Sequence, residues 1–147
     1  MNRIPTEIQH SIAEKLNIDI SDDTEAVAAA RILTFIAEAI GNPKAAANAS
    51  ERQIAFARSL GIDVSSDSSA IASAKISDIL YLKNREALAR LNIKPGDSVR
   101  KKIKLVVNGE TKELVEDAVV SSIQPNLRVF FKGGNGRGAW LSEIEKL

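Results

Sequence analysis

The residues best suited to chemistry lie in one short stretch, VFFKGGNGRGAW, which spans residues 129–140. It holds two phenylalanines, a loop with four glycines and two cations, and the only tryptophan of the chain. A loop of this kind can hold a phosphate through its backbone N–H groups or form the tip of a β-hairpin through glycines with positive φ. It can also present a surface to a nucleic acid. The composition alone leaves these three uses open.

The glycine pattern of residues 134–139 matches that of dinucleotide-binding folds, but its surroundings do not. Such a fold also requires a long helix, a second parallel strand and an acidic residue about twenty positions further on. Only eight residues follow Ala139. A Walker phosphate loop would need Gly-Lys-Ser/Thr, which the loop lacks. We therefore favour a hairpin tip, with a loop that grips a ligand through its N–H groups as the alternative.

Cations recur at alternate positions in two segments with the composition of β-strands. Because alternate side chains of a strand share a face, cations about 7 Å apart would line one side of each, close to the phosphate spacing of an extended nucleic acid. In the second segment a phenylalanine stands between two cations, as in surfaces that stack a base and pair its phosphates. The predicted nucleic-acid contacts are Arg100, Lys102, Lys104, Arg128, Phe130, Lys132 and Arg137.

A second interpretation of the same residues requires no ligand. A charged outer face keeps a small β-domain soluble and protects its edges from pairing with other chains. Phe130 would then be covered by other parts of the chain. Val99, Ile103, Leu105 and Val107 alternate with the first row of cations and are expected to face the core.

The sequence offers little material for catalysis or metal binding. There is no cysteine, and the single histidine, His10, aligns with the apolar Ile54 of an internal repeat, which predicts a packed ring. The aspartates between positions 19 and 23 lack the glycine turn and distal glutamate of a calcium loop. We therefore expect a non-enzymatic protein with no catalytic residues, no metal and no cofactor.

An internal duplication organises the first part of the chain. Residues 16–32, LNIDISDDTEAVAAARI, match residues 60–76, LGIDVSSDSSAIASAKI, at nine of seventeen positions. Upstream, Thr6 with Gln9 and Ser50 with Gln53 each form the capping-box pattern of a helix start. We expect Gly61 at the end of the third helix and Asp23 and Asp67 as caps of the second and fourth.

These signals predict a helical domain over residues 1–93, with repeats at 6–40 and 50–92. Each repeat would be a helix-loop-helix unit, and the fourth helix would continue to Leu91, before Pro95 and Gly96. The repeated Thr/Ser-x-x-Gln, Leu-Asn/Gly-Ile-Asp and Ala-x-Ala/Ser-x-Arg/Lys-Ile elements distantly resemble SAP-type modules and short helical units of bacterial and phage DNA-processing proteins. SAP-type modules contact DNA through basic residues near the second helix, whereas this region is acidic.

Residues 94–147 have the composition of a small β-domain. SVRKKIKLVV leads into Asn108-Gly109, a strong hairpin signal, and KELVE, AVVSSIQ, LRVFFKG and GAW follow as further short strands. The Pro95–Val99 entry and the segment Trp140–Ile144 resemble SH3-like barrels of the KOW and Tudor type. The expected fold class is thus α+β, with two duplicated helix-loop-helix units followed by a five-stranded SH3-like barrel.

Composition and charge bound the cellular setting and the partners. The net charge is +1; residues 1–93 carry 10 cations and 12 anions, for −2, and residues 94–147 carry 10 and 7, for +3. Any positive potential therefore belongs to the β-domain. The absence of cysteine suits a reducing cytoplasm, and neither a signal peptide nor a membrane span is expected.

The combined expectation is a nucleic-acid-associated protein, DNA- or RNA-binding, that contacts the phosphate backbone with little sequence preference. The partner would be a nucleic acid or a protein complex acting on it. The alternative is a protein-interaction module without affinity for nucleic acid, either an adaptor subunit or a small inhibitor of phage or mobile-element origin that acts on a host machine. The near-neutral net charge and the acidic helical half suit this alternative.

Overall fold

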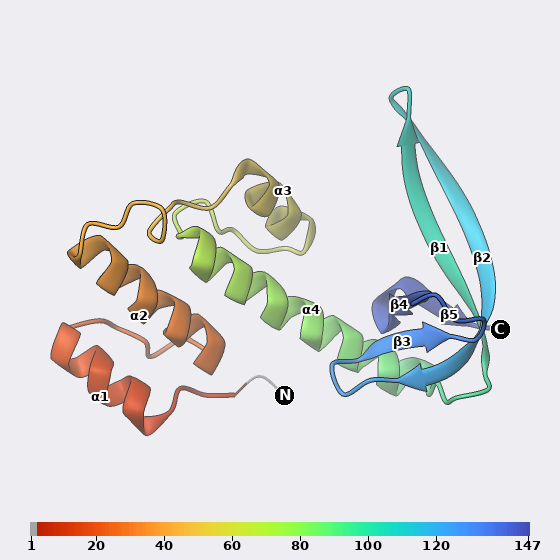
Figure 1. The fold of residues 1–147 in the computed structure, drawn as a ribbon, viewed down its shortest axis with the longest axis horizontal. Coiled ribbons are helices and arrows are strands. Elements are labelled where there is room, and N and C mark those ends of the chain that lie inside the picture. Colours follow the sequence, from red (N-terminus) through yellow and green to blue (C-terminus); the bar gives the residue numbers. More distant parts are fainter. Residues whose placement is uncertain (1–2) are drawn as a thin grey trace. The chain divides into compact units, whose positions relative to one another are not determined.

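The computed structural model describes residues 3–147 and shows an α+β chain, four helices followed by a five-stranded antiparallel sheet (Figure 1). The chain divides into two compact units, Met1–Leu80 and Tyr81–Leu147. The helices are α1 (Glu7–Leu16), α2 (Glu25–Ala39), α3 (Glu51–Ser59) and α4 (Ser69–Leu91). The strands are β1 (Ser98–Val107), β2 (Glu110–Ile123), β3 (Arg128–Phe131), β4 (Gly138–Trp140) and β5 (Ile144–Lys146).

The first helix of each repeat begins at the predicted capping box. The Thr6 hydroxyl accepts a hydrogen bond from the Gln9 backbone N–H, and the Gln9 side chain accepts one from the Thr6 N–H. Ser50 and Gln53 repeat both bonds at α3. Each pair satisfies two N–H groups that a helix start would otherwise leave free. At the other end of α3, Gly61 has the predicted positive φ, +86°.

The second helices are capped one residue later than the sequence suggested. Thr24, not Asp23, accepts the hydrogen bond from a first-turn N–H in α2, and Ser68, not Asp67, does so in α4. The two aspartates instead form ion pairs one residue before the caps, Asp23 with Arg31 at 2.7 Å and Asp67 with Lys75 at 2.8 Å. A carboxylate can cap a helix or pair with a cation. Each repeat has a cation eight positions after the aspartate, and the aspartate pairs with that cation instead of capping the helix.

Helix α4 continues to Leu91, as predicted, and belongs to both units. Its last turns place Ala87 in the core of the β-unit, with Tyr81, Leu88 and Leu91 packed against that core. Asn84, which is buried, accepts a hydrogen bond from the Ser142 N–H through its side-chain oxygen. The boundary between the two compact units lies inside α4, between Leu80 and Tyr81.

The sheet has the strand order β4-β3-β2-β1-β5, and all its pairs are antiparallel. The outer strands β4 and β5 do not pair, so hydrogen bonds do not close the sheet into a barrel. A short 3₁₀ helix, Leu141–Glu143, joins these two strands. Between β1 and β4, which are not neighbours, the Lys101 ammonium donates to the Gly138 carbonyl at 3.2 Å. The predicted five strands are present, and the predicted barrel is not confirmed.

The composition of the five strands differs from the prediction at one place. KELVE and AVVSSIQ, expected as two strands, belong to the single strand β2, and β5 supplies the fifth. Asp117, which lies between the two segments, pairs with Arg100 across the ladder instead of ending the strand. A change of register between Val120 and Ser122 marks a bend within β2 that lies beyond the predicted break at Asp117.

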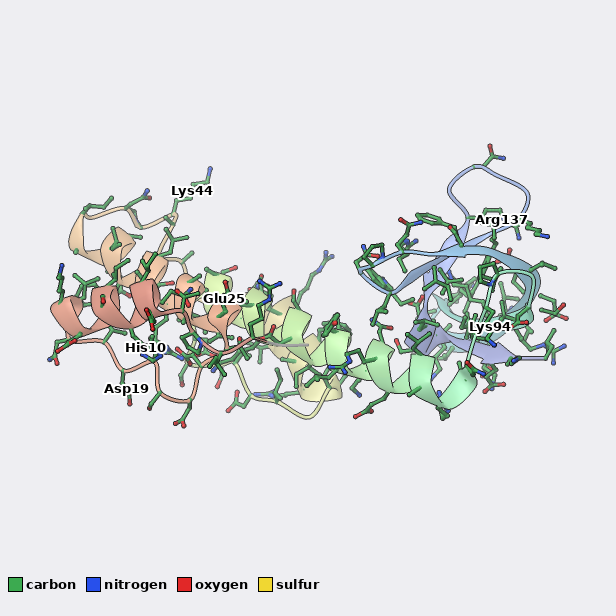
Figure 2. The ribbon with its side chains drawn as sticks, turned by 90° about the horizontal axis from the view of Figure 1, so that it is seen from below. His10, Asp19, Glu25, Lys44, Lys94 and Arg137 are labelled. Carbon is green, nitrogen blue, oxygen red and sulfur yellow. The ribbon has the colours of Figure 1, made fainter. Side chains whose placement is uncertain are left out.

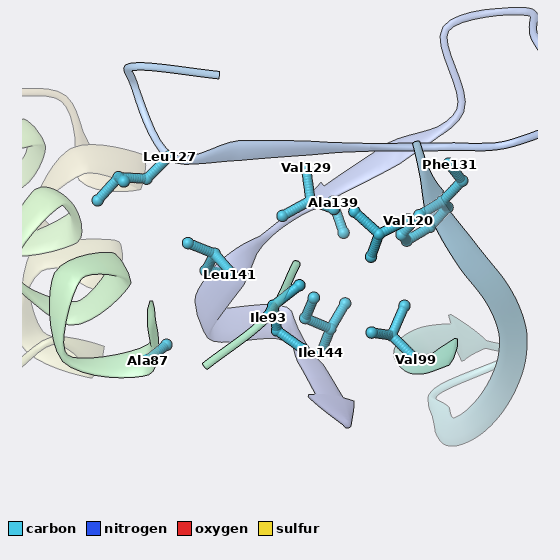
Figure 3. Packing of buried hydrophobic residues seen from close by; sticks show 10 residues of the cluster. All are labelled: Ala87, Ile93, Val99, Val120, Leu127, Val129, Phe131, Ala139, Leu141 and Ile144. Carbon is cyan, nitrogen blue, oxygen red and sulfur yellow. The ribbon is translucent and has the colours of Figure 1, made fainter. Parts of the chain in front are cut away.

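The core of the β-unit lies on one face of the sheet (Figure 3). Alternation along β3 explains this, since Val129 and Phe131 are buried while Arg128 and Phe130 are half-buried on the opposite side. The buried cluster consists of Ala87, Ile93, Val99, Val120, Leu127, Val129, Phe131, Ala139, Leu141 and Ile144. The opposite face of β3 therefore carries side chains that do not belong to this core, Arg128 and Phe130.

The hairpin of β1 and β2 extends well beyond the rest of the sheet (Figure 1). β5 pairs with β1 only at Val99–Lys101, and β3 pairs with β2 only from Val120 onward. Residues 102–115 therefore form a two-stranded ribbon. Its Leu105 and Val107, which alternation assigns to the core face, are 42% and 45% exposed because no third strand or helix covers them.

The helical unit holds two small matching cores. Ala13, Ile20 and Ala28 form the first, and Ala57, Val64 and Ala72, the same positions of the second repeat, form the other. A buried hydrogen bond of 2.7 Å joins the Thr34 and Ser68 hydroxyls, one from each repeat. In the described part of the chain, no helix has the length and apolar character needed to cross a membrane.

Candidate nucleic-acid interface

The outer face of β3 and β4 carries a cation stacked on an aromatic ring. Arg128 lies directly opposite Trp140 in the β3–β4 ladder. Its guanidinium carbon lies 5.2 Å from the centre of the Trp140 ring, within the range of a cation–π contact. Trp140 is 36% exposed. The pair forms a flat, partly open surface with positive charge on top.

Phe130 lies two residues further along the same face. It stands opposite Gly138 in the ladder and Ser122 on the other side. A Cβ atom at position 138 would lie 2.3 Å from the Val129 carbonyl oxygen and 3.4 Å from the Phe130 ring. Gly138 thus lets β4 approach β3 closely and leaves room beside the ring, which is half-buried rather than sealed in the core.

The glycine loop forms an open hollow next to Phe130, which we call the glycine-loop hollow. Its volume is about 300 Å³. Lys132 begins the loop and Arg137 ends it, and both side chains are exposed. Figure 2 shows Arg137 on the β-unit. The lining residues are Ser121, Phe130, Phe131, Lys132, Gly133, Gly134, Gly136 and Arg137. The structure therefore brings three of the predicted site residues, Phe130, Lys132 and Arg137, to one place.

The cations of β1 are arranged differently, because acidic neighbours pair with two of the three. Arg100 makes a two-pronged contact with Asp117 on β2, at 2.8 and 3.1 Å. Lys102 lies 3.1 Å from Glu145 on β5. The hydrogen bond from Arg100 lowers the pKa of Asp117, and that with Asp117 raises the pKa of Arg100. Most of the charge of this row is thus balanced within the sheet.

The three remaining cations also differ from one another. Arg137 forms an ion pair with Glu116 of β2 while it lines the glycine-loop hollow. Lys104 stands opposite Glu113 on the projecting ribbon and is exposed. Among the described residues, neither Lys104 nor Lys132 takes part in an ion pair. The seven predicted residues therefore form a compact group on β3 and its loop, and a separate row on β1.

Sequence reasoning missed Trp140 as a member of the outer face. A lone tryptophan is more often a core residue than a ligand platform, and the predicted set of contacts leaves Trp140 out. The available signal was register: a loop closing β3 onto β4 places Trp140 opposite Arg128, and Ala139 opposite the buried Val129. Alternation then assigns Trp140 to the outer face together with Arg128 and Phe130.

The helical unit shows no comparable site. His10, expected to be packed, is exposed and borders a shallow hollow with Asp19 (Figure 2). Asp19 and Asp63, at matching positions of the repeats, each accept hydrogen bonds that lower their pKa, from the Ser21 hydroxyl and N–H and from the Ser65 N–H and side chain. These are local turn contacts. Across residues 3–147, no group of histidines and carboxylates is arranged to hold a metal ion.

Comparison of the chain with models of protein families, with curated proteins and with solved structures gives no match.

Proposed function

We propose that this chain is a non-enzymatic nucleic-acid-associated protein that contacts a single strand through the outer face of β3 and β4. The observation that carries the proposal is the continuous row of Trp140, Arg128 and Phe130 beside the glycine-loop hollow. Bases stack on aromatic rings and on guanidinium planes, and nearby cations pair with phosphates. Stacking of this kind is tolerant of sequence, so the expected specificity is low.

The energetics assign the β1 row a minor part in this function. Exposed ion pairs contribute little to stability because water and salt screen them, and Arg100 and Asp117 are 42% and 52% exposed. A phosphate bound to Arg100 would lie beside the Asp117 carboxylate, which pairs with the same guanidinium and repels the phosphate. The Arg100 contact therefore brings little net affinity. Lys132 forms no ion pair within the described residues 3–147, so it supplies a phosphate contact without that cost.

The fold assignment behind the proposal is an SH3-like β-domain of the KOW or Tudor type preceded by two SAP-like helical units. The supporting features are the Pro95–Val99 entry, the five antiparallel strands and the short 3₁₀ helix before the last strand. Domains of this type bind ligands on the outer face of a curved sheet. The proposed row of cations and aromatic rings lies on the corresponding face of β3 and β4.

The test is a titration of labelled single- and double-stranded oligonucleotides, followed by fluorescence anisotropy at several salt concentrations. We expect tighter binding of the single strand. Lys132→Ala should lower the slope of log affinity against log salt by about 0.7, the value for one lost phosphate contact on a single strand. Phe130→Leu, which keeps an apolar side chain but removes the ring, should weaken binding by about 1–3 kcal/mol.

Matched control variants lie on β1. Arg100→Ala is the control for Arg128→Ala, and Lys104→Ala the control for Lys132→Ala, because each pair removes the same charge from the same sheet. The β1 variants should leave affinity nearly unchanged. Equal losses from both members of a pair would mean that the wrong face has been chosen. No binding of either oligonucleotide at low salt would refute the function itself.

A second candidate function is that of a protein-interaction module, an adaptor or an inhibitor. It is favoured by apolar residues that the helical unit leaves exposed. Leu33, Ile36 and Ile40 recur at helical spacing along one side of α2 and are 56%, 41% and 72% exposed. If this function holds, a stoichiometric protein partner should copurify after nuclease treatment and be lost on Ile36→Lys, while oligonucleotide binding is absent from the start.

A further inference from the structure

We propose that the projecting β-hairpin pairs edge to edge with the same hairpin of a second copy, through strand β2, about a two-fold axis at Leu114. The proposal is independent of nucleic-acid binding. It rests on three properties of residues 102–115: a free strand edge, exposed apolar side chains, and a charge pattern that matches itself in one alignment.

The backbone of β2 offers unpaired hydrogen-bonding groups along the free part of its edge. The hairpin turn Asn108-Gly109 has two residues, with φ of 53° and 77°. In such a turn the flanking residues, Val107 and Glu110, form a hydrogen-bonded pair, and hydrogen-bonded and non-hydrogen-bonded pairs alternate from there along the ladder. The backbone N–H and C=O groups of the odd-numbered β2 residues consequently point away from β1, as the hydrogen bond from the Lys132 N–H to the Val119 carbonyl demonstrates. The outward-facing residues that no strand pairs are Thr111, Glu113, Val115 and Asp117.

The side chains of the ribbon are unusually apolar for a solvent-exposed element. Leu114 is 51% exposed and Val115 54%. On β1, Val106 is 73% exposed. A two-stranded ribbon is only marginally stable by itself, and three or more strands with a shared apolar face are stable. Pairing two ribbons gives a four-stranded sheet, β1-β2-β2-β1, in which both apolar faces are extended.

Charge selects the strand and the alignment. In a two-fold pairing of β2 with itself, the axis can pass through residues 112, 113, 115 or 116 only by placing like charges opposite each other: Lys112 on itself, Glu113 on itself, Glu113 on Asp117, or Glu116 on itself. An axis through Leu114 avoids every such pair. It also places Lys112 of each copy opposite Glu116 of the other, a carboxylate that Arg137 of its own chain also contacts, and opposite charges across a ladder stabilise it.

Strand β1 is less suitable for the same purpose. Its free edge carries Lys102 and Lys104 and no acidic residue between Ile103 and Val107. Two copies of β1 would gather four lysines on one face without an opposite charge from the partner strand. On β2 the ladder would extend from Thr111 to Asp117 and end there, because the Val119 carbonyl already accepts the Lys132 N–H at 2.8 Å.

Cysteine cross-linking provides the sharpest test, since the chain has no cysteine of its own. At the axis, the two Leu114 residues form a non-hydrogen-bonded pair with Cα atoms about 4.5 Å apart, a separation that a disulfide spans. Leu114→Cys should therefore yield a disulfide-linked dimer on mild oxidation. Leu105→Cys is the matched control: it lies on the same face of the ribbon and is 42% exposed, but its two copies would stand roughly 20 Å apart, three strand spacings across the sheet and four residues along it.

Sedimentation of the full chain over a range of concentrations provides the second test. We expect a monomer–dimer equilibrium in which Glu113→Pro raises the dissociation constant about tenfold or more, because it removes an outward N–H from each copy. Lys104→Pro, which removes an outward N–H from β1, should leave the constant unchanged. Neither proline removes a bond within the hairpin. A monomer at every concentration, faster cross-linking through position 105, or loss of the dimer in Lys104→Pro alone would overturn the proposal.

Discussion

Gly138 is the residue on which the close approach of β4 to β3 depends. A Cβ atom there would lie 2.3 Å from the Val129 carbonyl, a backbone atom that cannot rotate away. Gly138→Ala should lower the free energy of unfolding by about 3 kcal/mol, as overpacking of a rigid site does. Gly134→Ala is the control: open space surrounds it, and its φ of +73° alone costs about 1 kcal/mol. Urea denaturation measures both, and equal losses would contradict the model of strand approach.

Asp117 makes the β-unit sensitive to acid. Its pKa is lowered in the folded state, chiefly by the hydrogen bond from Arg100. A group with a depressed folded pKa contributes stability above its unfolded pKa, about 3.9, and loses that contribution as the pH falls through the folded value. Unfolding of Asp117→Asn should therefore depend less on pH than that of the original chain as the pH falls below about 4. An identical pH dependence would show that the ion pair is not formed in solution.

At the scale of residues, the sequence predicted which side chains share a strand face but not which of them have partners. Alternation places Arg128 and Phe130 together, as observed. It says nothing of the carboxylate opposite Arg100, because that contact depends on the register of β1 against β2. The place of Trp140 on the outer face was not predicted for the same reason, since the turn and the bulge set the cross-strand register.

A buried pair of hydroxyls joins the two helical repeats, together with the hydrogen bond from the Thr24 hydroxyl to Asp78. The Thr34 hydroxyl lies 2.7 Å from that of Ser68, which also caps α4. Thr34→Val keeps the shape but removes this bond, and should cost about 2 kcal/mol, the desolvation penalty of a buried group left unpaired. Thr34→Ser keeps the hydroxyl and loses one methyl, about 0.8 kcal/mol. A valine variant as stable as the original would contradict this account.

At the scale of elements, the sequence predicts the helices more reliably than the strands. Capping boxes and apolar spacing are local signals, and they give α1, α3 and the end of α4 correctly. The ribbon of residues 102–115 shows the limit. Its alternation predicts a core face, yet no other element covers Leu105. Coverage is a long-range property that a single strand pattern does not encode.

The two compact units should respond separately to core mutations. Leu141 is fully buried in the β-unit, so Leu141→Ala should cost about 2–5 kcal/mol and reduce amide protection in β1–β4 while α1–α3 keep theirs. Val64→Ala, in the core of the second repeat, should show the reverse pattern. Hydrogen exchange measures both. A uniform loss of protection across all elements would mean that the chain unfolds as one cooperative unit.

At the scale of the whole molecule, composition gave the correct broad class, helices followed by an antiparallel sheet. It also gave the uneven charge, −2 before residue 94 and +3 after it by residue count. It could not predict that much of the positive excess is balanced by contacts inside the sheet, nor that the division into units falls within α4. The proposed nucleic-acid surface is accordingly smaller than the predicted one and includes a residue outside the predicted set.

Trp140 fluorescence tests the central claim most directly, because this is the only tryptophan of the chain and it lies in the proposed contact face. Addition of an unlabelled single-stranded oligonucleotide should quench or shift the emission in a saturable way, and rising salt should reverse the change. Emission that stays constant while a labelled oligonucleotide binds under the same conditions would place the contact elsewhere and contradict the account.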